Sequence, residues 1–338
     1  MEIYQNKIVA LAISDIHIND WPPLIYNNYE YPQDRLYQSL RVLDLISNNA
    51  HNLDVPILFA GDLFHKPKNL PNKVINEFIN YYRLYLEDRG VKFIAISGNH
   101  DQDSQNFLDR GNRANSYINA FSKVFKTLIC IDESSYTNKN FIVCGIPYLT
   151  YNSGFKRCLE RLKQVVSQEN KLKILLIHTD LPGAKGIYGN EIGEHRNIPD
   201  NLNEFFKPFD LVLDGHIHLP QKITKNIQIL GAPYQQNSGE MGIKMGYWEV
   251  YLDGSLKFKN LDLPQYKYWD FKKGLPTDKY HIYIPKKDSL KIKHEEENNN
   301  SQFDISKSRK SIAKNYLKKK GIKSKMKKRA LIGILKKS

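Results

Sequence analysis

Five segments of the chain are short, continuous apolar runs, and each is followed directly by glycine or polar residues. A run that is apolar at every position is typical of a strand that is buried on both faces, as in the parallel sheets of α/β proteins. The sequence therefore predicts buried strands within residues 8–14, 55–61, 92–98, 173–177 and 210–215.

Between these runs, apolar residues recur at the three- and four-residue spacing of an amphipathic helix. This pattern predicts helices over Arg35–Ile46, Val74–Glu87 and Phe155–Val166. Because buried strands alternate with amphipathic helices, residues 1 to about 235 are expected to form an α/β layered domain.

The pattern changes to period-two hairpins late in the chain. The segment YWEVYLDGSLKFKNLDL places Asp253-Gly254 between two alternating stretches, which predicts a β-hairpin. Aromatic-rich segments, YKYWDF and YHIYI, follow it. We therefore expect a main domain over residues 1–245 and a small β-rich extension over 246–284.

The remaining residues read as a linker and a tail. Residues 285–305 are polar and of low complexity, which predicts a linker. Residues 306–338 carry the apolar positions Ile312, Ile322, Met326 and Ile334 at largely helical spacing. This pattern predicts a helical tail that orders against a partner.

The tail also carries the excess charge of the chain. The 338 residues include 50 Lys and Arg against 36 Asp and Glu, a formal net charge of +14. Between Lys307 and Lys337 there are 14 basic and no acidic residues, so the rest of the chain is formally neutral. Attraction to a polyanion is therefore expected at the tail rather than over the main domain.

Cysteine use and hydropathy favour a cytoplasmic protein. Cys130, Cys144 and Cys158 form no metal-like pair and are interpreted as buried, reduced thiols. The sequence begins with a strand-like run instead of a charged-then-apolar leader, and no apolar run approaches membrane-spanning length. No association with a membrane is expected.

Side chains that bind metal ions follow each predicted buried strand. The motifs SDIHIND, GDLFHK, GNHD, IHTD and DGHIHLPQ hold six of the ten histidines. Strand ends in an α/β fold meet at one crevice, so residues distant in sequence can gather there. The candidate site residues are Asp15, His17, Asp62, His65, Asn99, His100, His178, His216 and His218.

The spacing and chemistry of these residues predict a shared metal centre. In an extended segment, Asp15 and His17 would point to the same side, as would His216 and His218. One such pair occurs by chance in many chains and also suits a structural histidine. Five motifs in order, with nitrogen and oxygen ligands and no thiolate, instead predict two divalent ions that activate water against a phosphate ester.

From residue 8 to about 235, the motifs resemble those of the calcineurin-like metallophosphoesterase superfamily. GDLFH and GHIHLPQ resemble more specifically the SbcD-type DNA-repair nucleases in their compact, phage-like form. The resemblance implies a layered αββα sandwich followed by a small C-terminal β-rich extension and the basic helical tail. It also implies manganese as the metal, with magnesium, iron or zinc as alternatives.

The resemblance further implies two ligand sets that share one bridging carboxylate. Asp15, His17, Asp62 and His218 would hold the first ion, and Asp62, Asn99, His178 and His216 the second. Asp101, Asp180 and Asp214, which flank these ligands, are interpreted as supporting groups.

His100 is not needed as a ligand in this scheme, so we expect it to stabilise the transition state or to donate a proton to the leaving oxygen. The resemblance implies that His65 helps to position the substrate near the leaving group. A packing role for His65 is the alternative.

As a function, the resemblance implies 3′-5′ exonuclease activity on duplex DNA and endonuclease activity on single strands, in recombination and repair. The chain would form a homodimer and work with an SbcC-like coiled-coil ABC ATPase, in the host cytoplasm if it is encoded by a phage. The tail lies where an ATPase-docking element belongs, and binding of DNA by the tail is the alternative. A phosphatase or cyclic phosphodiesterase for small substrates is the alternative activity, and an inactive scaffold would lack the ligands.

Overall fold

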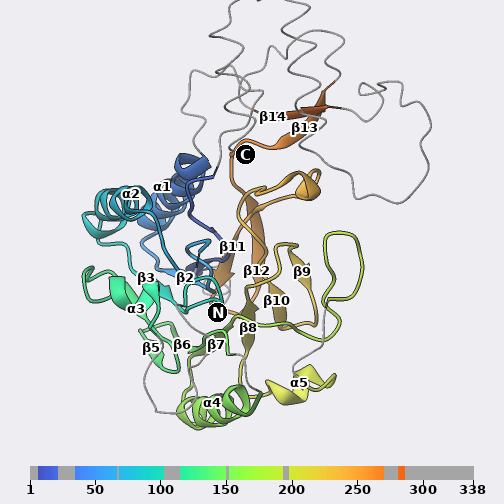
Figure 1. Cartoon of the computed structure of the whole chain (residues 1–338). Coiled ribbons are helices and arrows are strands. Elements are labelled where there is room, and N and C mark those ends of the chain that lie inside the picture. Colours follow the sequence, from blue (N-terminus) through green and yellow to red (C-terminus); the bar gives the residue numbers. More distant parts are fainter. Residues whose placement is uncertain are drawn as a thin grey trace, which may run out of the picture. The chain divides into compact units, whose positions relative to one another are not determined.

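A computed structural model describes residues 7–21, 35–66, 68–102, 115–149, 152–192, 198–269 and 281–285 (Figure 1). The chain divides into two compact units, residues 1–269 with 274–284, and residues 270–273 with 285–338. Apart from Pro285, the described residues all belong to the first unit. The rest of the predicted linker and the predicted basic tail lie outside the described residues.

Six strands form the first sheet, in the order β12-β11-β1-β2-β3-β4. The four strands from β1 to β4 are parallel, β11 runs antiparallel to β1, and β12 runs antiparallel to β11. The bounds are β1 (Ile8–Ile13), β2 (Ile57–Phe59), β3 (Phe93–Ala95), β4 (Leu128–Cys130), β11 (Gly246–Tyr251) and β12 (Leu256–Asn260).

The second sheet has the order β5-β6-β7-β8-β10-β9. Its four central strands are parallel, and the two edge strands, β5 and β9, are antiparallel to their neighbours. The bounds are β5 (Ser135–Thr137), β6 (Phe141–Ile146), β7 (Leu172–Ile177), β8 (Leu211–Asp214), β9 (Gln221–Lys222) and β10 (Ile227–Ile229).

Three apolar cores hold four layers together. One core lies between the two sheets, a second packs helices α1 to α3 on the first sheet, and a third packs α4 and α5 on the second. The helices are α1 (Arg35–Leu53), α2 (Asn72–Tyr82), which continues as a π-helical turn at Arg83–Glu87, α3 (Tyr117–Phe121), α4 (Asn152–Val166) and α5 (Leu202–Phe205). The expected αββα sandwich is confirmed, as are the five predicted strands and the three predicted helices.

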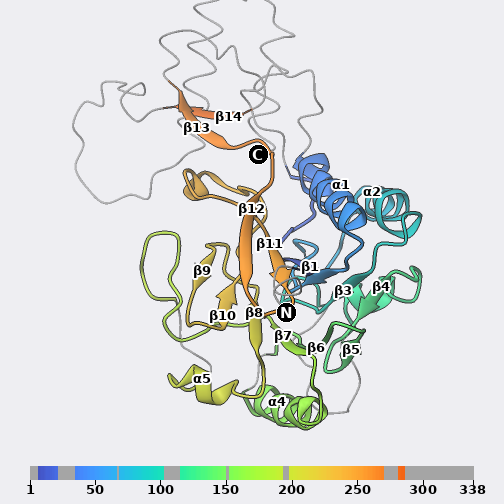
Figure 2. The ribbon, with the colours of Figure 1, turned by 180° about the vertical axis from the view of Figure 1, so that it is seen from behind.

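The predicted hairpin is also present, with Gly254 at its turn in the left-handed conformation (φ 79°). Its strands, β11 and β12, belong to the first sheet, as the view from behind shows (Figure 2). The first sheet therefore continues past residue 245, because β11 hydrogen bonds to β1. The alternating pattern predicts a hairpin but does not reveal which sheet the hairpin joins. A separate two-stranded sheet follows, formed by β13 (Tyr266–Trp269) and β14 (Ile282–Pro285).

The loops that follow the parallel strands run beside one another. Asp15 N donates to Gly61 O at 2.9 Å, and His17 N donates to Asp62 O at 3.0 Å, so the loops after β1 and β2 are joined by backbone hydrogen bonds. None of the helices in the described part of the chain is both long and apolar enough to cross a bilayer.

Candidate metal centre

The structure gathers all nine candidate side chains around the loops that follow β1, β2, β3, β7 and β8. Three groups have potential ligand atoms within 4.8 Å of one another: Asp15, His17 and His218; Asp62, His178 and His216; and His17, His65 and His100. Asn99 joins the second group, because its Oδ1 lies 3.0 Å from His178 Nε2 and 3.1 Å from His216 Nδ1.

The candidate ligands lie on tight turns rather than on extended strands. Asp15, His17, Asp62 and His216 have φ values of 54°, 50°, 61° and 74°. The expectation that Asp-x-His and His-x-His are extended is therefore wrong. The strands β1 and β8 end before these motifs, and left-handed turns bring the side chains into the same site.

Two glycines make room for the carboxylate at the middle of the site. A Cβ on Gly98 would overlap the side chain and backbone nitrogen of Asp62. A Cβ on Gly61, which has a φ of 91°, would come within 2.5 Å of His178 Nδ1. The glycines in GD and GN therefore permit the close approach of three separate loops.

Asp62 belongs to the group with His178 and His216 and also lies beside His17 of the group with Asp15 and His218. Its Oδ2 is 3.5 Å from His17 Nε2 and 3.4 Å from His178 Nε2, while its Oδ1 accepts from His100 N at 2.8 Å. Burial acts to raise the pKa of Asp62, but the neighbouring His178 imidazole outweighs it, and the pKa lies well below its ordinary value. An ionised carboxylate in this position can reach ions on both sides.

Three histidines are oriented through the ring nitrogen that faces away from the cluster. His178 Nδ1 donates to Ala60 O at 2.7 Å, and His218 Nδ1 donates to the buried Glu240 carboxylate at 2.7 Å. His216 Nε2 lies 3.2 Å from Asp180 Oδ1. Hydrogen bonds of this kind select the tautomer and leave the opposite nitrogen available as a ligand.

The donor set fits divalent metal ions. His218 Nε2 and His17 Nε2 face each other at 3.2 Å, a separation that two ligands of one ion can adopt when each bond is about 2.0–2.2 Å. The other donors are carboxylate and amide oxygens and imidazole nitrogens, and the free cysteines Cys130, Cys144 and Cys158 are not among them. These ligands suit manganese, iron or zinc.

Asp101 supports the loops from beneath. Its carboxylate accepts from Asp62 N at 2.8 Å, Gly98 N at 2.9 Å and Phe64 N at 3.0 Å. Burial, with the nearby Asp62 carboxylate, raises the pKa of Asp101 to about 7. Asp214 is also buried, and its Oδ1 accepts from Thr179 N at 3.1 Å. Asp101, Asp180 and Asp214 are thus placed as the supporting groups that the sequence predicts.

His65 and His100 lie together at one side of the cluster. Their rings stack with centroids 5.3 Å apart, and His100 Nδ1 donates to His65 O at 2.5 Å. Burial, together with His100, lowers the pKa of His65 to about 4, so this imidazole is neutral at pH 7. Trp21 packs on His65 with ring centroids 4.1 Å apart, and the Arg35 guanidinium lies 4.8 Å above the Trp21 ring.

Several residues that shape the site were not among the individual candidates predicted from the sequence. Besides Trp21 and Arg35, these are Glu240, which holds His218, and Gln236, whose Nε2 donates to Asp15 O at 2.6 Å. Of these residues, only Glu240 belongs to a pattern that can be recognised in the sequence. It closes a capping box with Asn237 at a short 3₁₀ turn, a pattern visible in the sequence NSGE.

Two mixed sheets with a cluster of aspartates, histidines and an asparagine at their strand ends define a metal-dependent phosphoesterase. The chain belongs to the calcineurin-like phosphoesterase family, whose model matches residues 8–220. It is therefore a hydrolase, and its His/Asp clusters are consistent with a dimetal site.

Relatives in two groups are similar to the chain. A protein of Invertebrate iridescent virus 6 that is named as a phosphoesterase, 244L, is 25% identical over 65% of this chain and 70% of its own length. The SbcD component of the nuclease SbcCD from Staphylococcus saprophyticus is 27% identical, and that from Staphylococcus epidermidis 23%, each over 69% of this chain. The chain spans 64% of the length of both SbcD proteins, which is less than two thirds.

Among solved structures, a dimetal phosphatase from Danio rerio matches 75% of this chain and 96% of its own, with a TM-score of 0.49 and 12% sequence identity.

Proposed function

We propose that this phosphoesterase is a DNA nuclease that cleaves phosphodiester bonds with two divalent metal ions. Manganese is the metal that we propose for both sites. The observation that carries the two-metal chemistry is the arrangement around Asp62, whose carboxylate lies within 3.5 Å of both His17 and His178. A carboxylate shared by two ions is what a two-metal phosphoesterase requires.

In this proposal, the seven ligands divide into two sets that share Asp62. When bound, the ions would supply an activated water and neutralise charge on the phosphate oxygens. The carboxylates and imidazoles of this chain bind and space the ions, while Ala60 O, Glu240 and Asp180 keep three of the rings in place. The first set is Asp15, His17, Asp62 and His218, and the second is Asp62, Asn99, His178 and His216.

His100 is the proposed proton donor. Because a carbonyl oxygen only accepts, the His100 Nδ1 that contacts His65 O must carry its hydrogen, which leaves Nε2 as the nitrogen that can exchange a proton. A protonated Nε2 would donate to the leaving oxygen of the cleaved ester. His65, which is neutral at pH 7 and packed against Trp21, would position the substrate beside His100.

The nuclease assignment is supported by two observations. The chain is similar to two SbcD components of SbcCD nucleases over more than two thirds of its own length. It has the GDLFH and GHIHLPQ wording, and a histidine, His65, follows Asp62 at the position typical of that group. On the same basis we propose a homodimer that works in DNA recombination and repair with an SbcC-like ATPase, docked through the basic tail.

A phosphoesterase for small substrates is the second candidate. The relative from the iridescent virus is named only as a phosphoesterase, at an identity close to that of the SbcD proteins, so the similarity to it supports a phosphoesterase without specifying DNA as the substrate. The metal ligands would be the same for both activities, so the two activities have to be distinguished by comparing substrates.

The deciding experiment compares substrates and variants of the full chain. End-labelled duplex and single-stranded DNA, bis-p-nitrophenyl phosphate and p-nitrophenyl phosphate are incubated with manganese or magnesium. We expect manganese-dependent cleavage of DNA and of the diester. Asp62→Ala and His100→Ala should each lower the rate of DNA cleavage by at least ~10²-fold, the scale of losing one group that acts in the transition state.

His51→Ala is the matched control, because His51 is an exposed histidine of α1 outside the motifs, and its activity should equal that of the wild type. Turnover of the monoester with intact DNA would support the small-substrate phosphoesterase instead of the nuclease.

A further inference from the structure

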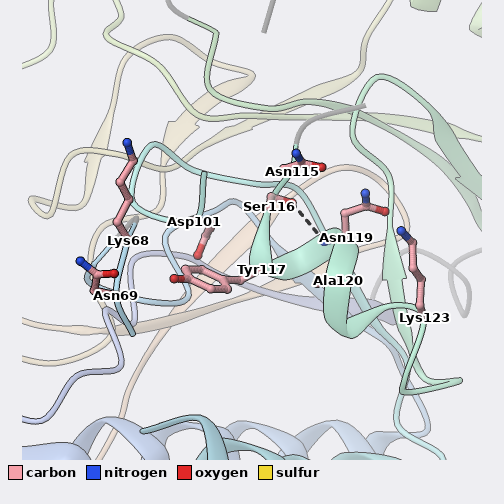
Figure 3. Close-up of a pocket in the computed structure, with 9 residues that line it drawn as sticks. All are labelled: Lys68, Asn69, Asp101, Asn115, Ser116, Tyr117, Asn119, Ala120 and Lys123. Atoms are coloured by element: carbon pink, nitrogen blue, oxygen red, sulfur yellow. Dashed lines mark hydrogen bonds between the residues drawn. The ribbon is translucent and has the colours of Figure 1, made fainter. Parts of the chain in front are cut away.

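A polar pocket of about 410 Å³ is lined by residues that follow the GDLFHK and GNHD motifs and by residues of α3 (Figure 3). Lys68 and Asn69 stand on one side of it, Asn119 and Lys123 on the other, and Asn115 lies near the latter two. The pocket lining therefore offers two ammonium groups and three side-chain amides, all of which can donate hydrogen bonds.

Among the residues that the structure describes, the charge of this pocket is not balanced by acidic side chains. Its one carboxylate, on the fully buried Asp101, is directed inward and accepts three backbone hydrogen bonds, from Asp62, Phe64 and Gly98. Lys68 and Lys123 are exposed, and neither is paired with an acidic side chain in the part of the chain that the structure describes. The pocket is thus complementary to an anion.

Two walls of the pocket continue directly from the motifs that carry His65 and His100. Lys68 follows His65 by three residues, a separation that a chain spans with at most about 11 Å. Asp101 follows His100, and Tyr117 N donates to Asp101 O at 3.0 Å. The pocket therefore lies within a few nucleotides of the position that a scissile phosphate would occupy, since phosphates of one strand follow about every 3.4 Å along a DNA helix.

The opposite wall is tied to the same motif. Ser97 precedes the GNHD motif, and its backbone nitrogen and hydroxyl donate to the buried Asp132 carboxylate at 2.8 and 2.6 Å. Because the single hydroxyl hydrogen of Ser97 is used there, the Ser116 hydroxyl donates to Ser97 Oγ at 2.7 Å. Gln102 forms a β-bridge with Ser116. These bonds hold the start of α3 beside the end of β3 and fix this wall of the pocket.

We propose that this pocket binds a backbone phosphate of the nucleic-acid strand, up to about three nucleotides from the cleaved bond. The inference rests on the proposed nuclease function and extends it, because a small ester has no second phosphate to place there. Lys68 and Lys123 provide the charge, and the asparagine amides provide the hydrogen bonds. The pocket thereby discriminates polymers from small esters.

The test removes the two lysines and measures binding and catalysis separately. Lys68→Ala/Lys123→Ala is compared with Lys156→Ala/Lys207→Ala, which removes the same charge from exposed positions on α4 and just after α5, in the outer layer of the second sheet. The affinity for a labelled single-stranded oligonucleotide is measured by fluorescence anisotropy in EDTA over a range of salt concentrations. The kcat/KM for DNA and for bis-p-nitrophenyl phosphate is measured with manganese.

We expect the pocket variant to bind the oligonucleotide about five- to tenfold more weakly at low salt. The slope of its log affinity against log salt concentration should be shallower by about 1.4, because two contacts to a single strand are lost. Its kcat/KM for the diester should be unchanged. The proposed phosphate site would be overturned if the wild type and the pocket variant bound the oligonucleotide with equal affinity. It would also be overturned if the control variant lost as much affinity, or if kcat/KM for the small diester fell as much as kcat/KM for DNA. A wild type that hydrolyses esters but neither binds nor cleaves DNA would overturn the nuclease function itself.

Discussion

Four candidate ligands hold backbone conformations that cost energy. Asp15, His17, Asp62 and His216 all lie in the left-handed region, where residues other than glycine lose about 1–2 kcal/mol each. Local hydrogen bonds offset part of this cost: His216 N donates to the Asp15 carboxylate at 3.1 Å, and His17 N donates to Asp62 O at 3.0 Å. Strain that is held in place by the surrounding loops is typical of a preformed functional site.

At the same scale, Glu240 is expected to control the affinity of the metal centre. Its carboxylate orients His218 and raises the pKa of this imidazole against the opposing effect of burial. Glu240→Gln keeps the shape but removes the charge, so we expect manganese affinity, measured by isothermal titration calorimetry, to fall about 10- to 100-fold.

Glu249→Gln is the matched control for Glu240, because Glu249 is a buried glutamate in β11 that pairs with Lys259. The metal affinity of this control should stay at the wild-type value. Equal affinities for wild type and Glu240→Gln, with the fold retained by circular dichroism, would contradict the role of Glu240.

At the scale of elements, the buried strands were predictable and the edge strands of the second sheet were not. The runs that form β1, β7 and β8 are apolar at nearly every position, which identifies a strand buried on both faces. The edge strands β5 and β9 are only three and two residues long and largely polar, so they carry no periodic signal. The ligand turns were missed for a related reason, since nothing in Asp-x-His distinguishes an extended segment from a left-handed turn.

The junction between the π-helical turn and β4 depends on one carboxylate. Glu87 accepts from Thr127 N at 3.0 Å, from Thr127 Oγ1 at 2.6 Å and from Lys126 N at 3.0 Å. Burial acts to raise the pKa of Glu87, but these hydrogen bonds outweigh it, and the pKa lies below its ordinary value of 4.5. Glu87 therefore stabilises the fold above pH 4.5, and this stabilisation is lost as the pH falls through the lowered pKa.

We expect Glu87→Gln to lower the free energy of unfolding by about 1 kcal/mol at pH 7, measured by urea denaturation, and to flatten its pH dependence below 4.5. Asp88→Asn, an exposed neighbour, removes the same charge and should leave the stability within about 0.5 kcal/mol of the wild type. Identical denaturation curves for Glu87→Gln and the wild type would show that this junction does not depend on the charge.

At the scale of the whole molecule, the candidate site and the excess positive charge lie in different parts of the chain. All nine candidate site residues fall between residues 15 and 218, whereas 14 of the 50 basic residues fall between 307 and 337. The motifs made the candidate site readable from sequence, because each follows its own buried strand. The hydrogen-bond partners of these histidines come from distant segments, so only the fold brings them together.

This separation predicts that truncation after Asp304 leaves manganese affinity unchanged and weakens association with an SbcC-like ATPase in co-purification. A full-length chain with serine at Ile312, Ile322, Met326 and Ile334 keeps the charge and removes the apolar positions, so it separates docking from attraction to DNA. If docking is correct, this variant also loses the ATPase but keeps its salt-dependent affinity for DNA. Undiminished co-purification of the truncated chain would contradict docking by the tail.

Anomalous diffraction from crystals soaked in manganese would show whether Asp62 is shared by two metal ions. We expect two anomalous peaks, one beside Asp15, His17 and His218 and one beside Asn99, His178 and His216, with Asp62 in contact with both. A single peak, or peaks that leave Asp62 without a metal contact, would contradict this expectation.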